Sequence, residues 1–272
     1  MNYVDTLLAH LARHKVEELG VLEHGSWSRT RRPYPHILPK TALELNLCCG
    51  LRAPMWELIR KRPNWRRHSD FAHLNSSQAM CWNVLMPALV LPEGLQQLTA
   101  AMALPAPAED IDFEVVLNQA EFTNFDAVLP LARDGRALVE AKLTERKFGT
   151  ASLSYDRESK RRGIYTETLK GRVPADLLNE GPFYANYQLL RNLSYLTRPE
   201  DRLVLLMPKA NTQLVAMARS FVDRVLPPWQ EQVSVLFVED LIDRLLALQT
   251  TSLGKAHFEE CRRKYVVPSE AR

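Results

Sequence analysis

The amino-acid sequence predicts an α/β fold in which a mixed central sheet is flanked by helices and preceded by a helical N-terminal extension. Three observations lead to this prediction. Apolar residues recur at helical spacing in several segments, the middle of the chain has the pattern of three consecutive antiparallel strands, and helices alternate with apolar strands after residue 182. Such alternation is typical of a sheet that is covered on both faces.

Composition agrees with an ordinary globular protein. Of the 272 residues, 46% are hydrophobic and 25% are charged, which supplies core for one large domain or two small ones. The net charge of +3 is too small to identify a polyanionic partner by itself. The four cysteines form no Cys-x-x-Cys motif, so we expect buried, reduced thiols rather than a zinc site or a disulfide framework.

Membrane insertion is not expected. No apolar run approaches the roughly 20 residues that a membrane-spanning helix needs, and the N-terminus lacks the layout of a signal peptide. We therefore expect a cytoplasmic protein.

The chain is expected to divide into three parts. Residues 1–70 would form a helical extension packed on the core, with helices at residues 2–19 and 41–67. Residues 71–250 would form the core, and residues 251–272 a charged, peripheral tail.

The segment between the two N-terminal helices is irregular and basic. It holds three prolines and an arginine group that stands next to two aromatic residues. These side chains either grip a nucleic-acid backbone and stack on its bases or form a solvated surface loop, and the sequence leaves both interpretations open. The residues are Trp27, Arg29, Arg31, Arg32 and Tyr34.

Two further basic segments are candidates for contacts with nucleic-acid phosphates. The first ends the helix at residues 41–67, and the second lies in the polar stretch 150–181, which is either a substrate-facing insertion or a solvated connection. Charge runs are also a common feature of solvated surfaces. The cations are Arg60, Lys61, Arg62, Arg66 and Arg67 in the first segment and Lys160, Arg161 and Arg162 in the second.

A helix that starts at Asn75 or Ser76 is apolar on nearly all sides, which predicts that it is buried. Pro87 is expected to bend or end it. Gln78 either folds back onto the start of this helix in a capping box or belongs to a polar helix start that borders a catalytic cleft. His73 fits a structural histidine better than a catalytic base.

Three strands are expected in the middle of the chain. Residues 111–118 alternate apolar and polar side chains, which predicts the first strand. Residues 123–149 predict a hairpin of the second and third strands, because the turn dipeptide Asp134-Gly135 separates two apolar segments. Gly135 is expected to take the left-handed position of a three-residue loop.

This loop fixes the register of the hairpin. With Ala132 paired to Arg136, Asp126 lies opposite Lys142, and Glu140 shares their face because side chains two residues apart on a strand point to one side. A two-residue loop would move Asp126 to the other face. The longer loop therefore predicts two carboxylates and an ammonium together at one end of the hairpin.

Such a cluster has a chemical use. Carboxylate oxygens are hard ligands that suit Mg²⁺, which usually keeps several waters and also binds substrate phosphate oxygens. The metal activates water and offsets developing negative charge, and a neighbouring lysine can orient the water. The alternative is an ordinary cross-strand ion pair between Asp126 and Lys142 on a solvated sheet face.

The remainder of the core alternates helices and strands. A helix that begins near Pro182 carries Gln188 and Arg191 on the side opposite to its apolar face. Further elements are expected as a strand at residues 203–208, a helix at 212–226, a strand at 233–238 and a helix at 239–248.

The resulting order of helix, three strands, helix and strand (αβββαβ) resembles the common core of the restriction-endonuclease-like, or PD-(D/E)XK, nuclease superfamily. Its motif is an Asp at the start of the second strand and Glu-x-Lys in the third, which Asp126 and Glu140-Ala141-Lys142 match. Residues 74–89 and 187–192 also resemble helices of a bacterial subgroup of restriction-type endonucleases. The resemblance covers roughly residues 70–240, and Phe125 stands where the motif has Pro.

The resemblance implies a Mg²⁺-dependent endonuclease that acts on DNA, with Mn²⁺ as an alternative metal. Asp126 and Glu140 would hold the metal, and Lys142 would position or activate the water. Gln188 and Arg191 would reach the cleft from their helix. Many members add a further acidic ligand, for which Glu114, Glu121 and Glu145 are the candidates, with Glu121 ranked first.

Two other functions remain open at this point. The same fold could serve a DNA-binding or assembly protein without catalysis, or a nuclease that acts on RNA or in repair. Because double-strand cleavage generally needs two active sites, a homodimer is one expected assembly.

Overall fold

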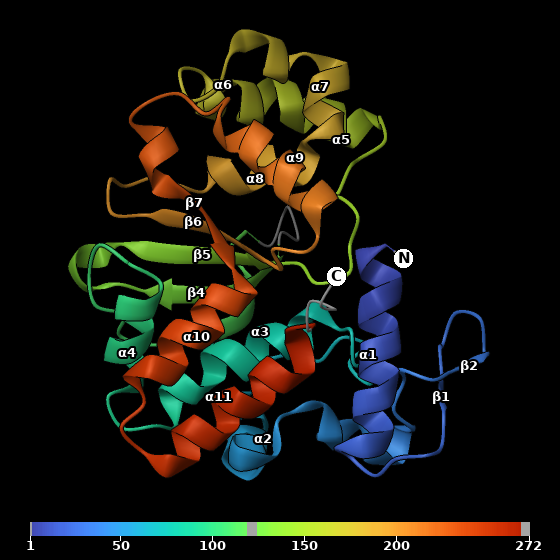
Figure 1. Ribbon diagram of the computed structural model, residues 1–272. Helices are drawn as coiled ribbons and strands as arrows, with labels where there is room; N and C mark the ends of the chain where they lie inside the picture. Colours follow the sequence, from blue (N-terminus) through green and yellow to red (C-terminus); the bar gives the residue numbers. More distant parts are fainter. Residues whose placement is uncertain (1, 119–123, 268–272) are drawn as a thin grey trace.

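The computed structural model describes residues 2–118 and 124–267, and the structural statements below refer to these residues. A five-stranded sheet with the order β3-β4-β5-β6-β7 lies at the centre (Figure 1). The first three strands are antiparallel neighbours, and the last two run parallel to β5. The predicted αβββαβ order and mixed sheet are confirmed. The strands are β3 (Asp112–Val116), β4 (Asn124–Pro130), β5 (Arg136–Ala141), β6 (Arg202–Met207) and β7 (Val233–Phe237).

Helices cover both faces of the sheet, as the apolar strands predict (Figure 1). On one face, Ala137, Val139 and Ala141 of β5 belong to a core shared with α1–α4, α10 and α11. On the other face, Leu138 packs with the helices between β5 and β7. The first group is α1 (Tyr3–Glu17), α2 (Arg52–Lys61), α3 (Ser77–Leu85), α4 (Gly94–Ala101), α10 (Val238–Leu248) and α11 (Ser252–Tyr265). The second group is α6 (Thr166–Leu169), α7 (Glu180–Ala185), α8 (Tyr187–Ser194) and α9 (Thr212–Val222), whereas α5 (Tyr155–Lys160) has no buried residue.

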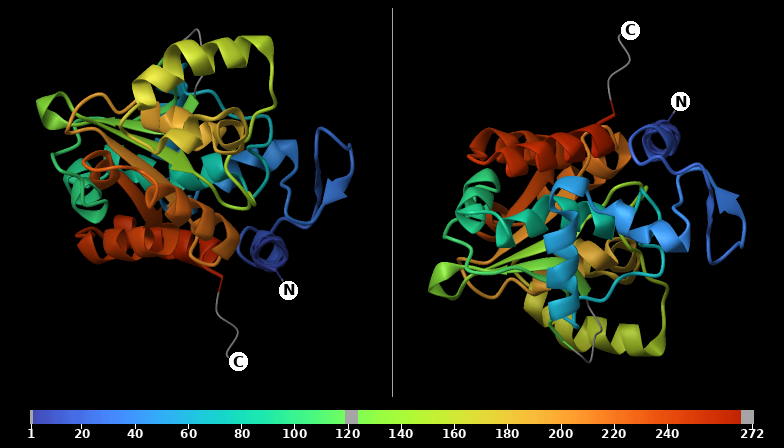
Figure 2. Two further views of the ribbon diagram at one scale, coloured as in Figure 1. Left: turned by 90° about the horizontal axis from the view of Figure 1, so that it is seen from above. Right: turned by 90° about the horizontal axis from the view of Figure 1, so that it is seen from below.

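Short elements connect these layers. In the N-terminal segment, β1 (Gly25–Ser26) and β2 (Pro33–Tyr34) form a small antiparallel hairpin where the sequence predicted irregular chain. Figure 2 shows this hairpin standing out from the body of the molecule, both from above and from below. The remaining short helices are η1 (Lys40–Asn46), η2 (Cys49–Leu51), η3 (Met86–Leu89), η4 (Ala132–Asp134), η5 (Arg161–Tyr165), η6 (Ala175–Leu178) and η7 (Trp229–Gln232).

The connection between β4 and β5 differs from its prediction. Pro130 pairs with Arg136, so the loop spans residues 131–135 and the register is shifted by two residues from the expected one. Extended by one pair, this register sets Asp126 across from Glu140 rather than Lys142. Asp126, Glu140 and Lys142 still share one face of the sheet, as predicted, because a shift of two residues does not move a side chain to the opposite face.

The glycine of this turn also has a different role. Arg133 and Asp134 take the left-handed conformation, with φ of 67° and 63°, whereas Gly135 does not. A Cβ atom at Gly135 would lie only 2.6 Å from Cβ of Glu200, so glycine is required there by close approach.

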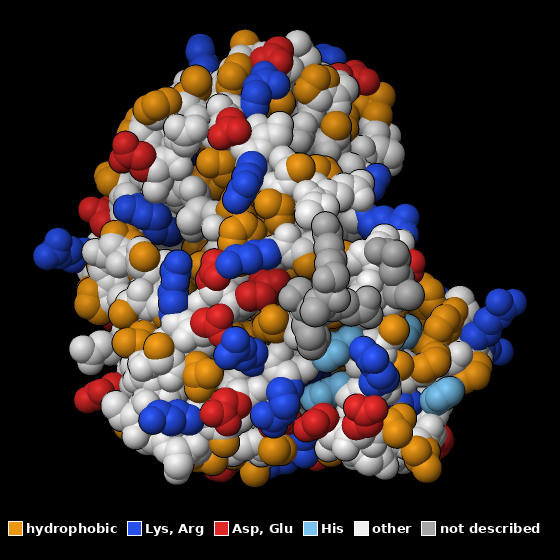
Figure 3. Space-filling model, viewed as in Figure 1, with side chains coloured by type: hydrophobic (Ala, Val, Ile, Leu, Met, Phe, Trp, Pro, Cys, Tyr) orange, Lys and Arg blue, Asp and Glu red, His pale blue; other side chains and the backbone are white. Residues whose placement is uncertain are grey.

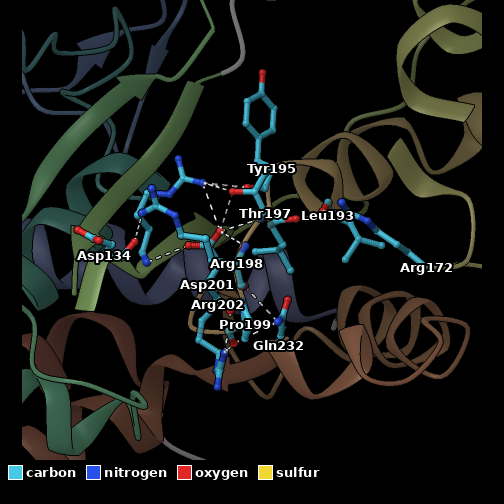
Figure 4. Close-up of polar contacts among 12 residues, drawn as sticks. Asp134, Arg172, Leu193, Tyr195, Thr197, Arg198, Pro199, Asp201, Arg202 and Gln232 are labelled. Atoms are coloured by element: carbon cyan, nitrogen blue, oxygen red, sulfur yellow. Dashed lines mark hydrogen bonds and ion pairs between the residues drawn. The ribbon is translucent and has the colours of Figure 1, made fainter. Parts of the chain in front are cut away.

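A buried aspartate ties this turn to the segment before β6 (Figure 4). The Asp201 side chain is fully buried and accepts hydrogen bonds from the backbone nitrogens of Arg136 (3.0 Å), Thr197 (2.8 Å) and Arg198 (3.1 Å). The guanidinium of Arg136 adds an ion pair at 3.3 Å. Arg198 in turn donates to the backbone oxygen of Asp134. The contacts of Arg136 with Asp201 and of Arg198 with Asp134 link the amino ends of β5 and β6.

The C-terminal segment is not the peripheral tail that its charge predicted. Residues 252–265 form α11, which packs on α1, α3 and α10 and buries Phe258, Cys261 and Tyr265. The buried ammonium of Lys264 donates to Oδ1 of Asn46 at 2.7 Å. The exposed side of the helix carries Lys255, Glu259, Arg262 and Arg263, and these charges mask its apolar side in the sequence.

The first and last helices lie side by side (Figure 1). Nε2 of His10 in α1 is 2.8 Å from the backbone oxygen of Arg263 in α11, and Arg263 forms an ion pair with Glu18 at 3.5 Å. The extension is thus anchored to the opposite end of the chain.

The other expectations are largely met. Three cysteines are buried thiols as predicted, but Cys49 is exposed, since it begins a short helix at the surface. Within residues 2–118 and 124–267, every helix is too short or too polar to cross a lipid bilayer.

Candidate active site

A cleft of about 630 Å³ opens where β5 ends. Its floor carries the predicted triplet Asp126, Glu140 and Lys142, and Thr144 and Glu145 follow on the same segment. Two further segments from the N-terminal half complete its walls, one from the β1–β2 hairpin and one from residues 68–78. These walls are formed by Trp27, Arg29, His68, Asp70, His73, Asn75, Ser76, Ser77 and Gln78.

Glu140 is held in place by neighbours on α8. Only 2% of the residue is exposed, and its Oε1 accepts hydrogen bonds from Nζ of Lys142 at 2.5 Å and Nε2 of Gln188 at 2.7 Å. Oε2 accepts one from Nδ2 of Asn192 at 2.9 Å. Fixed donors of this kind set the direction of the carboxylate.

Asp126 lies close to this carboxylate. Its Oδ2 accepts a hydrogen bond from the backbone nitrogen of Ala141 at 2.7 Å, which ties β4 to the end of β5. Burial raises the pKa of Asp126 well above its usual value, and the charge of Glu140 raises it further, while Lys142 acts in the opposite direction. Two carboxylates in one buried place are unfavourable without a compensating cation.

Lys142 supplies one positive charge to this cluster. Burial lowers the pKa of its ammonium, but the carboxylates of Glu140, Asp126 and Glu145 outweigh burial and raise the pKa above its usual value. Lys142 is therefore protonated at neutral pH, and its Nζ is a hydrogen-bond donor.

Glu114 faces the same cleft from the neighbouring strand β3. Its φ of 56° lies in the left-handed region, which is strained for a residue other than glycine in the middle of a strand. Its Oε2 accepts a hydrogen bond from Nδ2 of Asn124 at 2.5 Å. Burial raises its pKa, although hydrogen bonds from Gln78 and Asn124 oppose that shift. Strain of this kind is frequent at functional sites, and here it accompanies a carboxylate in the cleft.

The other predicted acidic residues have different placements. Glu145 lines the cleft, and its Oε2 accepts a hydrogen bond from the backbone nitrogen of Leu143 at 2.7 Å. Glu121, which the sequence ranked first, lies outside the described residues.

Gln78 borders the cleft and does not fold back onto the start of α3. Its Oε1 accepts a hydrogen bond from the backbone nitrogen of His68 at 2.8 Å, and its Nε2 donates to the backbone oxygen of Arg66 at 2.9 Å. Ser76 is the residue that caps α3, through a hydrogen bond from the backbone nitrogen of Ala79. Gln78 thus holds the wall formed by residues 66–68 in place.

Gln188 reaches the site from α8, as predicted. The helix expected from Pro182 is interrupted at Asn186, so α7 and α8 are separate and α8 starts beside the loop that follows β5. Oε1 of Gln188 accepts from the backbone nitrogen of Gly149 at 2.7 Å while Nε2 donates to Glu140. Arg191 is not among the described residues that line the cleft; its guanidinium lies 5.5 Å from the ring of Tyr187.

The first predicted basic run is partly neutralised within the protein. Arg62 forms ion pairs at 3.1 Å with Asp110 and Asp112, and Lys61 pairs with Glu57 at 2.5 Å. The guanidinium of Arg67 lies 5.2 Å from the ring of Trp56, and Arg60 and Arg66 are exposed.

The second basic run has acidic partners too. Lys160 pairs with Asp156 at 3.2 Å, and Arg161 and Arg162 both pair with Glu158, at 2.6 Å and 2.5 Å. No member of either run is among the described residues that line the cleft.

The sequence raised Trp27 and Arg29 as possible nucleic-acid contacts, but it did not indicate that they belong to the cleft. Trp27, Arg29 and His68 stand far before the catalytic motif in the chain, and only the fold brings them to it. Asn192, which fixes Glu140, sits four residues after Gln188 on the same helix face, so helical spacing could have found it once Gln188 was selected.

The ligand atoms present are compatible with a hard divalent cation. In the described residues, no group of three or more acidic, histidine or cysteine side chains is arranged to enclose a metal. Mg²⁺ needs fewer protein ligands, because one or two carboxylates, waters and phosphate oxygens complete its shell. The raised pKa of Asp126 beside Glu140 marks the place where a cation would relieve unfavourable charge.

The element order, the mixed sheet and the cluster of Asp126, Glu140 and Lys142 define a protein of the restriction-endonuclease-like class. A family model described as "Restriction Endonuclease associating with ARP" matches residues 8–266, and the chain belongs to that family. No curated protein and no solved structure matches the chain.

Proposed function

We propose that this protein is a Mg²⁺-dependent endonuclease that hydrolyses phosphodiester bonds in DNA. The observation that carries the proposal is the convergence of Asp126, Glu140 and Lys142 in one cleft, with Glu140 oriented by two amide side chains. Membership of a restriction-endonuclease family supports the nuclease class and DNA as the substrate.

Asp126 and Glu140 would hold the metal ion, with Glu114 as the additional carboxylate nearest to them in the sheet. When bound, Mg²⁺ would offset negative charge on the reacting phosphate and favour ionisation of water. Gln188 and Asn192 keep Glu140 from rotating, which preserves the geometry that a metal ligand requires.

Lys142 would act as a hydrogen-bond donor and not as a base, because its raised pKa keeps the ammonium charged. From Nζ it would orient the attacking water or stabilise an oxygen of the phosphate as charge develops. The water oxygen bonds to phosphorus, one ester bond between phosphorus and oxygen breaks, and a proton passes from the water to the departing oxygen through solvent.

Cleavage of supercoiled plasmid tests this proposal. The protein, Lys142→Ala and the control Lys255→Ala are incubated with plasmid in Mg²⁺, Mn²⁺ or EDTA; Lys255 is an exposed residue of α11. We expect metal-dependent cleavage by the protein and the control, and a rate at least about 100-fold lower for Lys142→Ala.

Each other outcome decides against part of the proposal. Equal cleavage by Lys142→Ala, or cleavage in EDTA, would refute the assigned site. DNA binding without cleavage in any metal would favour a non-catalytic binding or assembly protein. Cleavage confined to RNA or to damaged DNA would mean that this nucleic acid, and not intact DNA, is the substrate.

Assembly is part of the same proposal. Cutting both strands at one position calls for two active sites, so we propose that a homodimer acts on duplex DNA, and light scattering with and without DNA measures it. The family description also names an association with ARP, which we extend to this chain as a proposal.

A further inference from the structure

We infer that the hairpin of residues 25–34, here called the arginine arm, binds the phosphate backbone of duplex DNA beside the bond to be cleaved. The inference rests on the proposed function and adds a substrate-binding site that lies outside the catalytic motif. The arm carries Arg29, Arg31 and Arg32, and Arg29 and Trp27 line the same cleft as Asp126 and Glu140.

The base of the arm is fixed to the body of the protein. The backbone nitrogen of Gly25 donates to the oxygen of Ile37 at 2.9 Å, and a Cβ at Gly25 would lie 2.0 Å from the oxygen of Leu38. The buried ammonium of Lys15 donates to the backbone oxygens of Glu23 (2.7 Å) and Ile37 (3.3 Å). These contacts hold the arm in one orientation relative to the cleft.

Aromatic contacts continue from the arm into the cleft wall. The ring of Trp27 meets Tyr34 at 6.2 Å and His73 at 6.1 Å between centroids, both edge to face. Oγ of Ser28 also donates to Oδ1 of Asp70 at 3.4 Å. His73 and Asp70 both line the cleft, so the arm is a continuous part of its wall.

The arginines of the arm differ from the other basic segments in their partners. Arg29, Arg31 and Arg32 are exposed, and none of them forms an ion pair with an acidic residue in the described part of the chain. Figure 3 shows Lys and Arg side chains gathered at the end of the projection that the hairpin forms. Their positive charge is therefore available to an external anion.

An electrostatic requirement of the cleft favours DNA phosphate as that anion. Asp70, Glu114, Asp126, Glu140 and Glu145 line the cleft and repel a polyanionic substrate. Cations at the rim offset this repulsion and draw the backbone to the catalytic carboxylates. The arm supplies such cations where the acidic cleft opens.

The arm contacts the backbone through guanidinium groups and not by stacking on bases. The guanidinium carbon of Arg29 lies 5.8 Å from the centroid of the Trp27 ring, and Tyr34 and His73 pack against that ring as well. Trp27 therefore contacts Arg29 and two further rings, which favours a role in positioning Arg29 over stacking on an unpaired base. This arrangement suits a duplex, in which the bases are already stacked.

Binding measurements with a matched control test the inference. Arg29→Ala/Arg31→Ala/Arg32→Ala is compared with Lys209→Ala/Arg224→Ala/Arg262→Ala, which removes three exposed cations that are paired with Asp240, Asp176 and Asp243. Both variants lose the same formal charge. Affinity for a labelled duplex is measured in EDTA over a range of salt concentrations, so that no cleavage occurs, and circular dichroism verifies folding.

For the arm variant we expect affinity to fall on the order of 100-fold at 0.1 M salt and the logarithmic salt slope to fall by about 3, roughly one for each lost phosphate contact. The control should change affinity less than about 3-fold. Replacement of the three arginines by lysine should keep most of the slope, because phosphate contacts need charge more than shape.

The outcomes separate this inference from the proposed function. If the parent protein binds and cleaves DNA and the arm variant binds as tightly as the parent, the arginine arm is not a DNA-binding site. The proposed nuclease function would still stand. An equal loss in the control variant also refutes the arm, since net charge would then explain the effect. If the arm variant loses more affinity for single-stranded than for duplex DNA, the arm binds DNA by stacking on bases instead. No DNA binding by the parent protein would overturn both proposals.

Discussion

The two ends of strand β5 carry buried acidic groups in opposite circumstances. At its amino end, Asp201 accepts three backbone hydrogen bonds and pairs with Arg136. At its carboxyl end, Glu140 and Asp126 lie close together, and Lys142 provides the one neighbouring ammonium in their cluster of described residues. The first carboxylate has every partner it needs, whereas the second pair carries more negative charge than the site neutralises.

The difference distinguishes a structural acid from a functional one. A buried carboxylate with matched donors stabilises the fold, because removing it leaves those donors unsatisfied. Buried carboxylates that repel one another lower stability and persist where a cation or substrate uses them. We expect substitutions at the two ends of β5 to separate stability from activity.

The largest expected effect is on catalysis at the carboxyl end. Asp126→Asn keeps the size of the side chain but removes a charged ligand atom, so the plasmid cleavage rate in Mg²⁺ should fall at least 10³-fold, about 4 kcal/mol of transition-state stabilisation. Initial rates of nicking measure it. Wild-type cleavage by this variant would show that Asp126 takes no part in the reaction.

The second-largest expected effect is on the stability of the fold, through Asp201 at the amino end of β5. Asp201→Ala removes the acceptor of the backbone nitrogens of Arg136, Thr197 and Arg198 and the ion-pair partner of Arg136, and the free energy of unfolding should fall by about 3 kcal/mol. Urea denaturation measures the change. The exposed control Asp223→Ala should stay within about 0.5 kcal/mol of the parent. If Asp201→Ala is as stable as the control, the contacts of Asp201 in Figure 4 do not stabilise the fold.

Added Mg²⁺ should stabilise the folded protein only through the carboxylates at the carboxyl end of β5. At a Mg²⁺ concentration 100 times the dissociation constant, the folded state gains about 2.7 kcal/mol relative to EDTA. Thermal unfolding should therefore shift upward in the parent and in Asp201→Ala, and should not shift in Asp126→Asn. An unchanged melting temperature in the parent would contradict a metal site in the cleft.

The smallest expected effect is on the free energy of unfolding in the absence of metal. Because Asp126→Asn removes repulsion with Glu140, we expect this variant to be about 1 kcal/mol more stable than the parent in EDTA at neutral pH. Chemical denaturation of both proteins side by side provides the measurement. A loss of stability would mean that the attraction between Asp126 and Lys142 outweighs the repulsion between Asp126 and Glu140.

Sequence reasoning identified the core elements because their signals are local. Alternating apolar residues and a Gly-containing turn predicted the hairpin, and the parity of the register placed Asp126, Glu140 and Lys142 together. The details of the turn were not predictable in the same way. Gly135 is needed because Glu200 lies against it, and that contact joins residues far apart in the chain.

The walls of the cleft were the main part that local patterns could not predict. Trp27, His73 and Asn75 have no spacing that relates them to the catalytic motif, and they reach it only because the fold packs residues 25–34 and 68–78 beside it. The helix at residues 252–265 was mistaken for a tail because its charges dominate its composition, although its buried face carries Phe258 and Tyr265.

The pairing of α1 with α11 affects when the site can form during synthesis. Lys15 of α1 holds the base of the arginine arm, and α1 itself rests on α11, whose residues leave the ribosome long after the arm and the catalytic motif. Contacts between such distant segments form late, because closing a long loop costs entropy before the contacts repay it. A growing chain would thus carry Asp126, Glu140 and Lys142 before the wall beside them is in place, so that a complete cleft arises only after residues 252–265 have been synthesised.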